Sequence, residues 1–374
     1  MFYLAFGNYV PNTAPINRIM AYIRALSEFG KETHVVFFFP NKTYDKVHDV
    51  YPHIEFEYLW ENGYIDIPLL NKLSLRFYVK HFIKKLRPGD TIYVYAFPDL
   101  VIELAKRKDI RVFVERTEFD KVSFPCHAKK ISIPKFLDAC RNIDGVIVIS
   151  QMLKQYYIEQ GCKPDRVHVV NMIVDTSRFK NLKKQPSEPY IAYCGTATNT
   201  KDGVDELIKA FSIVVKSHPE YKLYIIGSTP SKRQRFDNYE LVKKLGIESN
   251  VVFTGIVPSM HMPQILKNAS ILALDRPDNL QAKYGFPTKL GEYLLTSNPV
   301  VITSVGDIPL FLKDMESALI AEPQNPHAFA AKMSWAIEHP EEAKVIGYNG
   351  RIVAERFFNS TIETNKIINI VFNP

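Results

Sequence analysis

A glycine-containing loop in the second half of the chain has the composition of a phosphate site. Gly195 follows a β-branched and aromatic run at residues 190–194, and the loop continues through Lys201 and Gly203 to a helical pattern that begins at Val204. The start of a helix offers unpaired N–H groups and the positive end of its dipole, and Lys201 adds a positive charge. The loop lacks the GxxxxGK[ST] pattern of a Walker loop. A plain strand-to-helix turn with an exposed lysine fits this segment equally well.

A second candidate is the segment 284–293, which reads YGFPTKLGEY. Thr288 and Glu292 are four residues apart, so a helix starting near Thr288 places both on one face. A carboxylate at this position can accept hydrogen bonds from both ribose hydroxyls, while N–H groups near Thr288 and Lys289 meet phosphate. The alternative is that Glu292 only complements the helix dipole.

The third candidate is the loop 255–258, which reads GIVP and follows a β-branched run at residues 251–253. A backbone loop at the carboxyl end of a strand can pair with the edge of a nucleotide base. A plain turn is the competing interpretation.

Strand and helix patterns alternate along the chain and must position these loops. The first series of predicted strands covers residues 2–6, 33–38, 91–95, 111–114, 146–149 and 167–170, and the second covers 190–194, 222–226, 251–253, 271–274, 300–303 and 318–320. The predicted helices include residues 17–29, 72–86, 204–217, 238–245, 262–267 and 289–295. This alternation predicts right-handed βαβ crossovers and an α/β fold of two doubly wound, Rossmann-like parallel sheets.

The polar stretch KNLKKQPSE at residues 180–188 separates the two series and predicts a linker. The predicted organisation is a Rossmann-like domain at 1–180, a linker at 181–189, a second domain at 190–345 and a helical segment at 346–374. The two domains are expected to face a cleft lined by the carboxyl ends of their strands. The helical pattern from Pro340 places Ala343, Ile346, Ile352 and Phe357 on one face.

From Val167 onward, these segments together resemble glycosyltransferase family 4, the retaining GT-B enzymes. That family shows Gly-Arg after a strand, a Lys-Gly about six residues later, then Gly-x-Val, Glu-x7-Glu, Pro-Val-Val and Gly-x-x-Pro. The matching residues here are Gly195, Lys201 to Gly203, Gly255 to Val257, Glu292, Pro299 to Val301, and Gly306 with Pro309. Residues 169–175 (VVNMIVD) with Phe179 resemble the family's Pro-Asn-Gly-Val-Asp segment. The form at 285–293 is similar to that of bacterial surface-polysaccharide transferases.

The resemblance implies a GT-B fold with a C-terminal helix that crosses back, and it implies a donor site. The implied donor residues are Gly195, Thr196, Gly255, Ile256, Tyr284, Gly285, Phe286, Pro287, Thr288, Lys289 and Glu292, with Lys201 as the catalytic cation. Thr196 stands where the family has Arg, so one charge for the diphosphate is missing, and Lys289 is a candidate to compensate for it. Tyr284 replaces the first Glu of the Glu-x7-Glu pair, which leaves the identity of the sugar open.

The first half of the chain resembles the family only in architecture. Glu118 follows the strand 111–114 at the place where the family often has a His facing the donor sugar, and it is assigned a catalytic role. A solvated loop carboxylate is the alternative. The loop after the first strand lacks the family's Gly-Gly pair, and Asn8, Asn12 and Arg18 are assigned to acceptor contacts.

A basic amphipathic pattern covers residues 72–87. Its cations are Lys72, Arg76, Lys80, Lys84, Lys85 and Arg87, and its apolar residues are Leu73, Phe77, Phe82 and Leu86. Such a helix can lie on an anionic membrane. The alternative is a helix that covers a sheet and has a solvated outer face.

Composition excludes several classes of protein. The 374 residues carry 47 Lys and Arg against 40 Asp and Glu, a net charge of +7, and 12% are aromatic, which excludes a disordered chain. No apolar run reaches the length of a membrane span, and the start of the chain does not resemble a signal peptide. The four cysteines show no CxxC pair and are expected to be reduced, as in the cytoplasm. No basic tract with stacking aromatics predicts nucleic-acid binding.

The function implied is that of a retaining hexosyltransferase that uses a UDP- or GDP-sugar and a glycan or lipid-linked acceptor hydroxyl. Its expected setting is polysaccharide or glycoconjugate synthesis in the cytoplasm, including the inner face of the membrane. The sequence has no Asp-x-Asp to hold a divalent ion on the diphosphate, so no metal and no cofactor are expected. The alternatives are a nucleotide-sugar epimerase of the same fold and a non-catalytic nucleotide-sugar-binding partner.

Overall fold

The computed structural model describes residues 1–11, 13–39, 45–62, 71–123, 132–229 and 231–373. The chain forms two compact units, and each is described by itself. Unit 1 contains Met1–Asn171 and Glu363–Pro374, and unit 2 contains Met172–Ile362. The boundary at residue 171 lies before the expected linker at 181–189.

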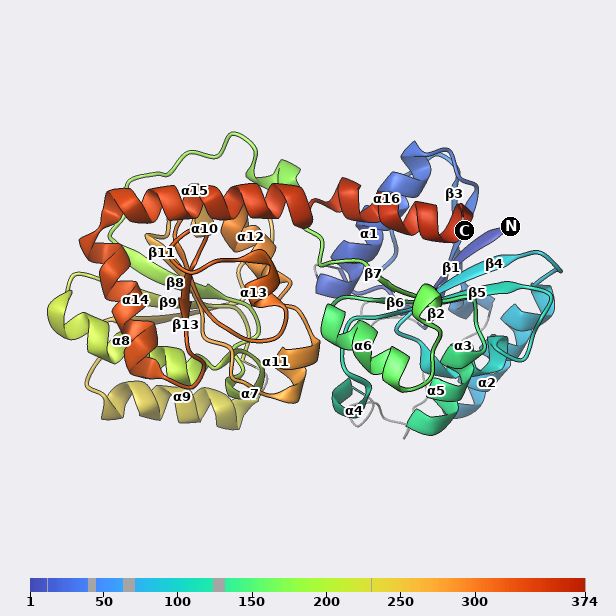
Figure 1. Ribbon diagram of the computed structural model, residues 1–374, viewed down its shortest axis with the longest axis horizontal. Helices are drawn as coiled ribbons and strands as arrows, with labels where there is room; N and C mark the ends of the chain where they lie inside the picture. Colours follow the sequence, from blue (N-terminus) through green and yellow to red (C-terminus); the bar gives the residue numbers. More distant parts are fainter. Residues whose placement is uncertain (12, 40–44, 63–70, 124–131, 230, 374) are drawn as a thin grey trace. The chain divides into compact units, whose positions relative to one another are not determined.

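Unit 1 is a doubly wound α/β unit (Figure 1). Its strands are β1 (Phe2–Asn8), β2 (Thr33–Phe39), β3 (Ile54–Tyr58), β4 (Thr91–Tyr95), β5 (Arg111–Arg116), β6 (Gly145–Val148) and β7 (Val167–Val169). Its helices are α1 (Ala14–Glu28), α2 (Asn71–Lys85), α3 (Pro98–Leu104), α4 (Asp120–Ser123), α5 (Ile133–Arg141) and α6 (Gln151–Glu159), with the 3-10 turns η1 (Leu59–Asn62) and η3 (Pro164–Arg166). Within the described residues, the strands form one parallel sheet in the order β3-β2-β1-β4-β5-β6-β7.

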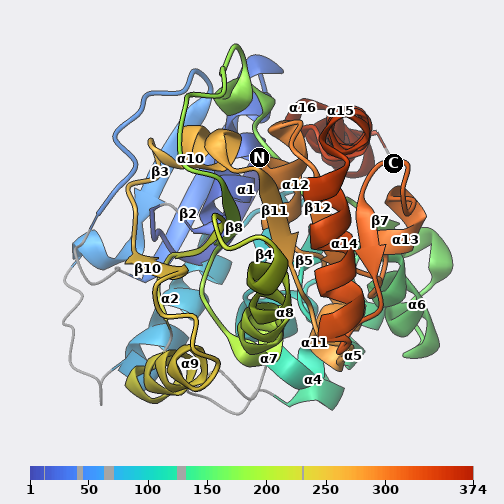
Figure 2. The ribbon, with the colours of Figure 1, turned by 90° about the vertical axis from the view of Figure 1, so that its left-hand side faces the viewer.

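Unit 2 repeats this architecture, and Figure 2 shows α8 and α14 side by side on it. Its strands are β8 (Tyr190–Cys194), β9 (Lys222–Ile226), β10 (Val251–Gly255), β11 (Ile271–Leu274), β12 (Val300–Thr303) and β13 (Leu319–Ala321). Its helices are α7 (Asn199–Asp202), α8 (Val204–Ser217), α9 (Lys232–Lys244), α10 (Met262–Asn268), α11 (Leu280–Tyr284), α12 (Lys289–Leu295), α13 (Ile308–Phe311), α14 (Pro326–Glu338) and α15 (Pro340–Phe357), and η4 (Thr176–Phe179) is a 3-10 turn. In the part of unit 2 that is described, the parallel strand order is β10-β9-β8-β11-β12-β13.

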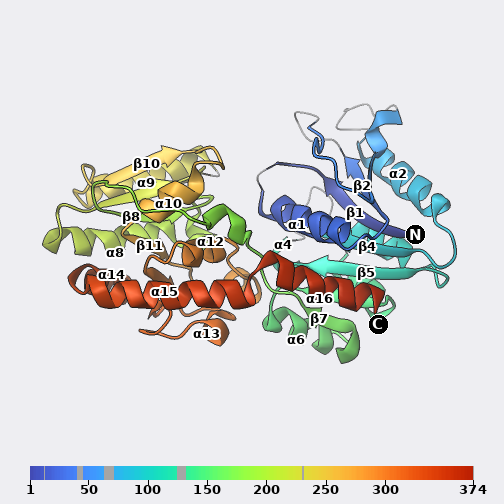
Figure 3. The same cartoon turned by 90° about the horizontal axis from the view of Figure 1, so that it is seen from above.

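Both predicted parallel sheets are confirmed. The expectation that the C-terminal helix crosses back to the first domain is also confirmed, because Glu363–Pro374 belong to unit 1. Helix α16 (Ser360–Phe372) ends within unit 1 (Figure 3). There the Phe372 ring centroid lies 4.9 Å from that of Phe2, and the Lys31 Nζ lies 4.7 Å from the Phe372 ring centroid. The strand β3 was not predicted. Its sequence IEFEY carries two glutamates on a half-buried edge strand, which weakens the apolar signal.

The predicted linker packs on unit 2, and this explains why the unit boundary lies earlier. Lys184 Nζ donates to the Ala269 carbonyl at 3.1 Å, and the Gln185 N–H donates to Asn268 Oδ1 at 3.0 Å. Upstream, the Val174 N–H donates to the Phe358 carbonyl at 2.8 Å. The chain therefore joins unit 2 soon after Asn171.

Helix α15 begins at Pro340 as predicted, but its packed face differs from the expected one. Ala343 and Ile346 are buried, whereas Ile352 is 46% exposed, so the expected placement of Ile352 on one face with them is wrong. Ile352 follows Ala343 by nine residues, which is about two and a half helical turns and puts it on the opposite side. Gly347 and Gly350 share the packed face, where their lack of side chains admits the backbone of Ser297, Asn298 and Ser317.

Helix α2, which contains most of the basic amphipathic pattern, packs on the sheet of unit 1. This agrees with the second interpretation of that pattern, a helix that covers a sheet and has a solvated outer face. Phe82 is fully buried, and its ring centroid lies 5.5 Å from Tyr3 and 5.4 Å from Phe38. Phe77, expected on the apolar face, is 65% exposed beside the exposed Arg76 and Lys80. Lys72 and Leu73 lie in the part of α2 whose side chains are not described.

Candidate functional site

The predicted donor residues of unit 2 gather where β8 ends and α12 begins. Tyr293 of α12 is fully buried, and its hydroxyl oxygen accepts a hydrogen bond from the Cys194 N–H at 2.5 Å and donates to the Cys194 carbonyl at 3.3 Å. These bonds fix α12 against the end of β8. Lys289 and Glu292, three residues apart on α12, are thereby held next to Cys194 and the loop that follows it.

Lys289 supplies a positive charge at the Gly195 loop. It forms an ion pair with Asp202 and donates to the Tyr193 hydroxyl at 3.1 Å, and its Nζ lies 4.6 Å from the Tyr193 ring centroid. Gly195 has a φ of +148°, and a Cβ on it would lie 2.8 Å from the Lys289 Cε and closer still to its Nζ. A glycine is therefore needed for the lysine to reach over the loop.

The Lys289–Asp202 pair lies in a poorly solvated environment. Burial lowers the pKa of Lys289 against the attraction of Asp202. Burial alone would raise the pKa of Asp202, but Lys289, Arg276 and Tyr193 together bring it below its ordinary value. Asp202 therefore stays ionised, and a bound anion would meet a cation that is already fixed in place.

The other predicted residues of this loop are more exposed. Thr196 is exposed, and its carbonyl accepts from the Tyr193 hydroxyl at 2.8 Å. Lys201 is half-buried on the short helix α7. The following helix α8 carries Asp205 and Glu206 in its first turn. These carboxylates already complement the positive end of the α8 dipole.

Glu292 is engaged by a residue that the sequence analysis did not identify. Its Oε1 forms an ion pair with Arg178 of η4, and the Arg178 Nη2 also donates to the Ser259 carbonyl at 2.9 Å. Burial raises the pKa of Glu292, while Arg178 opposes this shift. The sequence contained a signal for Arg178, because this residue directly precedes Phe179, which belongs to the segment that the sequence analysis had singled out.

The remaining donor candidates lie on two loops of unit 2. Gly255 ends β10 with a φ of +68°, its carbonyl accepts from the Gly227 N–H at 2.9 Å, and Ile256 is 82% exposed. Tyr284 ends α11 and is half-buried, Gly285 follows in extended conformation, Pro287 is buried, and Thr288 is exposed at the start of α12.

The expected donor contact of the Phe286 side chain requires a correction. Phe286 is 7% exposed, and its ring packs 5.6 Å from Phe311 and 5.3 Å from Phe358. Its side chain anchors the segment in the interior of unit 2, so only the backbone is left to contact a ligand at this position.

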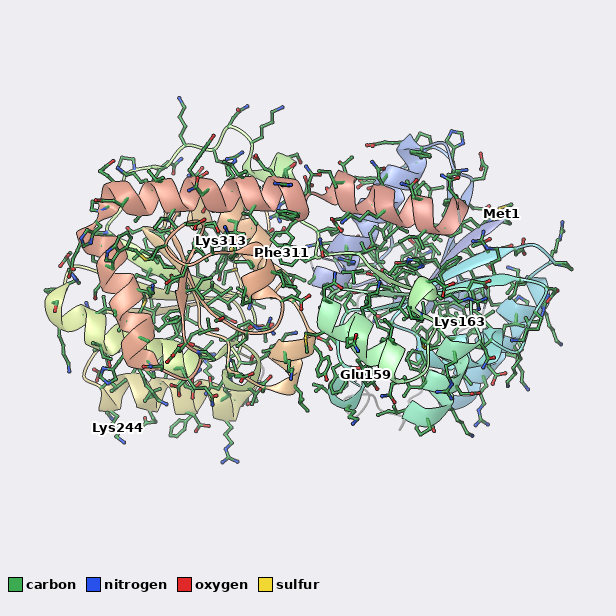
Figure 4. All side chains as sticks on the ribbon, in the orientation of Figure 1. Met1, Glu159, Lys163, Lys244, Phe311 and Lys313 are labelled. Carbon is green, nitrogen blue, oxygen red and sulfur yellow. The ribbon has the colours of Figure 1, made fainter. Side chains whose placement is uncertain are left out.

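Figure 4 labels Phe311, one of the rings that pack against Phe286, and shows that it lies inward. Lys244, at the end of α9, points outward in the same view.

Asp275 is a second residue that the sequence analysis missed. It follows β11, is 1% exposed, and its Oδ2 has no hydrogen-bond partner among the described residues. A Cβ on Gly203, which has a φ of +59°, would collide with the Asp275 carbonyl oxygen, so the close approach of the two segments requires a glycine at residue 203. Burial, together with Glu206 and Asp205, raises the pKa of Asp275 to about 7. No local sequence signal distinguishes this Asp from a surface residue.

In unit 1, Glu118 follows β5 between two buried ionic networks. Upstream, Glu115 accepts from Arg18 at 2.5 Å and from the Tyr93 hydroxyl at 2.5 Å. Downstream, Arg116 donates to Asp120 at 3.0 Å, and Asp120 accepts from the Tyr157 hydroxyl at 2.8 Å. Glu118 itself is half-buried. The networks restrain the backbone on both sides of Glu118.

The acceptor role expected for Arg18 is corrected by its burial. Arg18 is 4% exposed and pairs with Glu115, and it also donates to the Val170 carbonyl at 2.9 Å and to the Asn171 carbonyl at 2.5 Å. The Arg18 guanidinium is therefore already paired inside unit 1. Asn8 ends β1 and is exposed, and Asn12 lies outside the described residues.

The described residues contain no group of three or more His, Cys, Asp and Glu side chains placed to hold a metal ion. None of their helices combines the length and the apolar composition that crossing a membrane requires. Cys140, Cys162 and Cys194 are free, and burial raises the pKa of Cys194 to about 12; Cys126 lies outside the described residues.

Residues 174–353 match the family model of glycosyl transferases group 1. A D-inositol 3-phosphate glycosyltransferase of Segniliparus rotundus is 24% identical over 215 residues, covering 55% of this chain and 46% of the relative. A putative colanic acid biosynthesis glycosyltransferase, WcaL of Salmonella typhimurium, is 24% identical over 233 residues, covering 61% and 57%. The chain thus spans about half the length of these curated relatives.

Solved structures share the fold over the full chain. HepE of Anabaena, in complex with UDP, superimposes with a TM-score of 0.76 at 16% identity and covers 100% of both chains. The sucrose-phosphate synthase of Thermosynechococcus elongatus gives a TM-score of 0.75 at 17% identity, covering 98% of this chain and 97% of that one. The predicted GT-B fold, with two Rossmann-like units, is confirmed.

Proposed function

We propose that the protein is a retaining glycosyltransferase that moves a hexose from a nucleotide diphosphate sugar to an acceptor hydroxyl. The observation that carries this proposal is the arrangement on α12: Lys289 reaches over the Gly195 loop, and Glu292 lies three residues further along the same helix. A cation for a diphosphate and a carboxylate for a ribose are thus held by one rigid element.

The donor is proposed to be a UDP-sugar, with a GDP-sugar as the second choice. The neighbouring HepE structures contain UDP, or UDP-glucose, and the group 1 domain covers the residues of unit 2 that form the candidate site. The acceptor is proposed to be a glycan or a lipid-linked glycan, because one relative is named for colanic acid biosynthesis. The setting proposed is therefore polysaccharide or glycoconjugate synthesis in the cytoplasm.

In the proposed reaction, Lys289 and Lys201 stabilise the negative charge that develops on the leaving diphosphate. Fixed charges in a poorly solvated site do this without reorganising during the reaction. The leaving phosphate oxygen takes the proton of the acceptor hydroxyl, so the bond between the sugar and the phosphate breaks as the new glycosidic bond forms on the same face. Glu118 is the proposed sugar-facing carboxylate of unit 1. No metal or cofactor is part of the proposal.

The surface of α2 is proposed as a contact with the inner face of an anionic membrane. Arg76, Lys80 and Lys84 are exposed, and they flank Phe77, whose ring is 65% exposed. Cations beside an exposed aromatic ring suit an interface with acidic lipid headgroups.

A thermal-shift screen of nucleotide sugars tests the proposal, because a ligand that binds only the folded state raises the unfolding midpoint. The sugar that gives the largest shift is then incubated with the full chain, with and without glycan acceptors. Transfer that requires an acceptor supports the proposal. Isomerisation of the donor without an acceptor would show an epimerase, and binding without turnover would show a non-catalytic protein.

A further inference from the structure

Arg178 occupies a junction between three segments of unit 2. It lies on η4, which is capped by Asp175 through a hydrogen bond of 3.0 Å from the Ser177 N–H. Its guanidinium pairs with Glu292 on α12 and donates to the Ser259 carbonyl, at 2.9 Å, in the loop after β10. One planar side chain therefore connects the segment that enters unit 2, the loop after β10 and α12.

The loop after β10 has little packing of its own. Ile256 is 82% exposed and Met260 is 79% exposed, so burial of their side chains does not fix the loop. Its position rests on hydrogen bonds to its backbone carbonyls, among them one from the Gly227 N–H to the Gly255 carbonyl and one from the Arg178 side chain to the Ser259 carbonyl. Loss of the Arg178 side chain would remove one of these ties.

The pairing with Arg178 also leaves part of Glu292 available to a ligand. The salt bridge is made to Oε1, and an ionised carboxylate has about four lone-pair sites on its two oxygens. The Glu292 side chain is 23% exposed, so it is accessible. An arginine at one oxygen restricts the rotation of the carboxylate and leaves Oε2 to accept hydroxyl hydrogen bonds.

We propose that Arg178 is a positioning residue for nucleoside recognition: it aims Glu292 at the ribose hydroxyls and holds the loop after β10 in place for the base. This inference rests on the proposed function, since it assumes that a nucleoside diphosphate binds to unit 2.

Because of the charges around Glu292, this inference predicts how the affinity for a nucleotide depends on pH. Burial raises the pKa of Glu292, Arg178 lowers it, and Asp175 raises it. Two other titratable groups face Glu292: the Cys194 thiol at the end of β8 and the Tyr293 hydroxyl on α12. The positive charge of Lys289 also acts on the Cys194 thiol. Without the Arg178 charge, Glu292 binds a proton at a higher pH, and a protonated carboxyl is a poorer acceptor for two hydroxyls.

The experiment measures the affinity of the full chain for UDP and for GDP by calorimetry between about pH 5.5 and 8.5. The proteins compared are the wild type, Arg178→Gln, Arg178→Lys, Glu292→Gln and the double variant Arg178→Gln/Glu292→Gln. At each pH the Kd of a variant is divided by the Kd of the wild type, which cancels the titration of the ligand's own phosphate. Circular dichroism confirms that each variant is folded.

We expect Arg178→Gln to weaken binding by about tenfold or more near pH 6 and by less near pH 8.5. Arg178→Lys keeps the charge and should follow the pH profile of the wild type with a smaller loss. In the Glu292→Gln background, Arg178→Gln should add no pH dependence. A loss with Arg178→Gln that is equal at every pH would overturn the inference and leave the proposed function intact. A wild type that binds neither nucleotide would overturn both.

Discussion

Lys289 reaches directly over Gly195, so that a side chain at residue 195 would occupy the space of the Lys289 ammonium. The lysine is held there by Asp202 and by the Tyr193 hydroxyl at 3.1 Å. This relationship joins two segments that are far apart in the sequence, and it places a positive charge at the loop although residue 196 is a threonine.

Replacing Gly195 by Ala should displace Lys289 and strain the backbone, because φ at residue 195 is +148°. We expect the affinity for UDP to fall by about tenfold or more, measured by calorimetry. Gly30→Ala is the matched control, because Gly30 also has a positive φ, of +68°, but has nothing within 4 Å of an added Cβ. An equal loss of affinity in both variants would show that the collision with Lys289 is not the cause.

Lys289→Met should remove a charge for the diphosphate while keeping the length of the side chain. We expect kcat/KM to fall by roughly 10²–10³, the scale of losing one donor to a transition-state oxyanion, and the affinity for UDP to fall while that for uridine does not. Lys201→Ala should have an effect of the same kind. Lys244→Ala, an exposed lysine at the end of α9, is the control. An equal loss for UDP and uridine would contradict the assignment to the diphosphate.

Glu292→Gln should weaken nucleotide binding through the ribose. We expect the Kd for UDP to rise by about tenfold, while the Kd for the 2′,3′-dideoxy form, which lacks the hydroxyls, stays as in the wild type. Calorimetry on both ligands makes this comparison. If the variant loses the same factor with the dideoxy form, Glu292 does not contact the ribose.

Asp275→Asn should change the pH dependence of stability. The pKa of Asp275 is raised from 3.8 to about 7 in the folded protein, so the folded state holds this proton more tightly than the unfolded state does. The wild type should therefore lose stability relative to Asp275→Asn between about pH 4 and pH 7, by at most about 1.4 kcal/mol per pH unit, with a constant difference above that range. Urea unfolding at several pH values measures this. A difference that does not change with pH would show that the carboxyl titrates normally.

Transfer should survive chelation. The sequence has no Asp-x-Asp motif, and the proposed mechanism assigns the diphosphate charge to lysines. The activity of the full chain is measured after treatment with EDTA and again after adding Mg²⁺ or Mn²⁺. Strict dependence on either ion would contradict the proposal.

The sequence by itself determined the two series of alternating strands and helices, apart from the edge strand β3, and the places of the loops. Alternating β-branched runs and amphipathic stretches fix strand and helix types locally, so the segments 190–194, 204–217 and 289–295 were predicted with the bounds that the structure shows. The positions of Gly195, Glu292 and Lys289 followed from their place relative to these elements, together with a family resemblance that a single chain already displays.

Only the tertiary structure decided which charges meet. Asp202 and Lys289 are 87 residues apart, and Arg178 and Glu292 are 114 residues apart. Pairing over such separations depends on how strands and helices pack, which no local pattern encodes. The burial of single residues is also decided by tertiary packing. Arg18 looked available in the sequence, but it is buried with Glu115. The pKa of Asp275 is raised chiefly because the residue is buried at the end of β11, and Glu206 and Asp205 add to this shift.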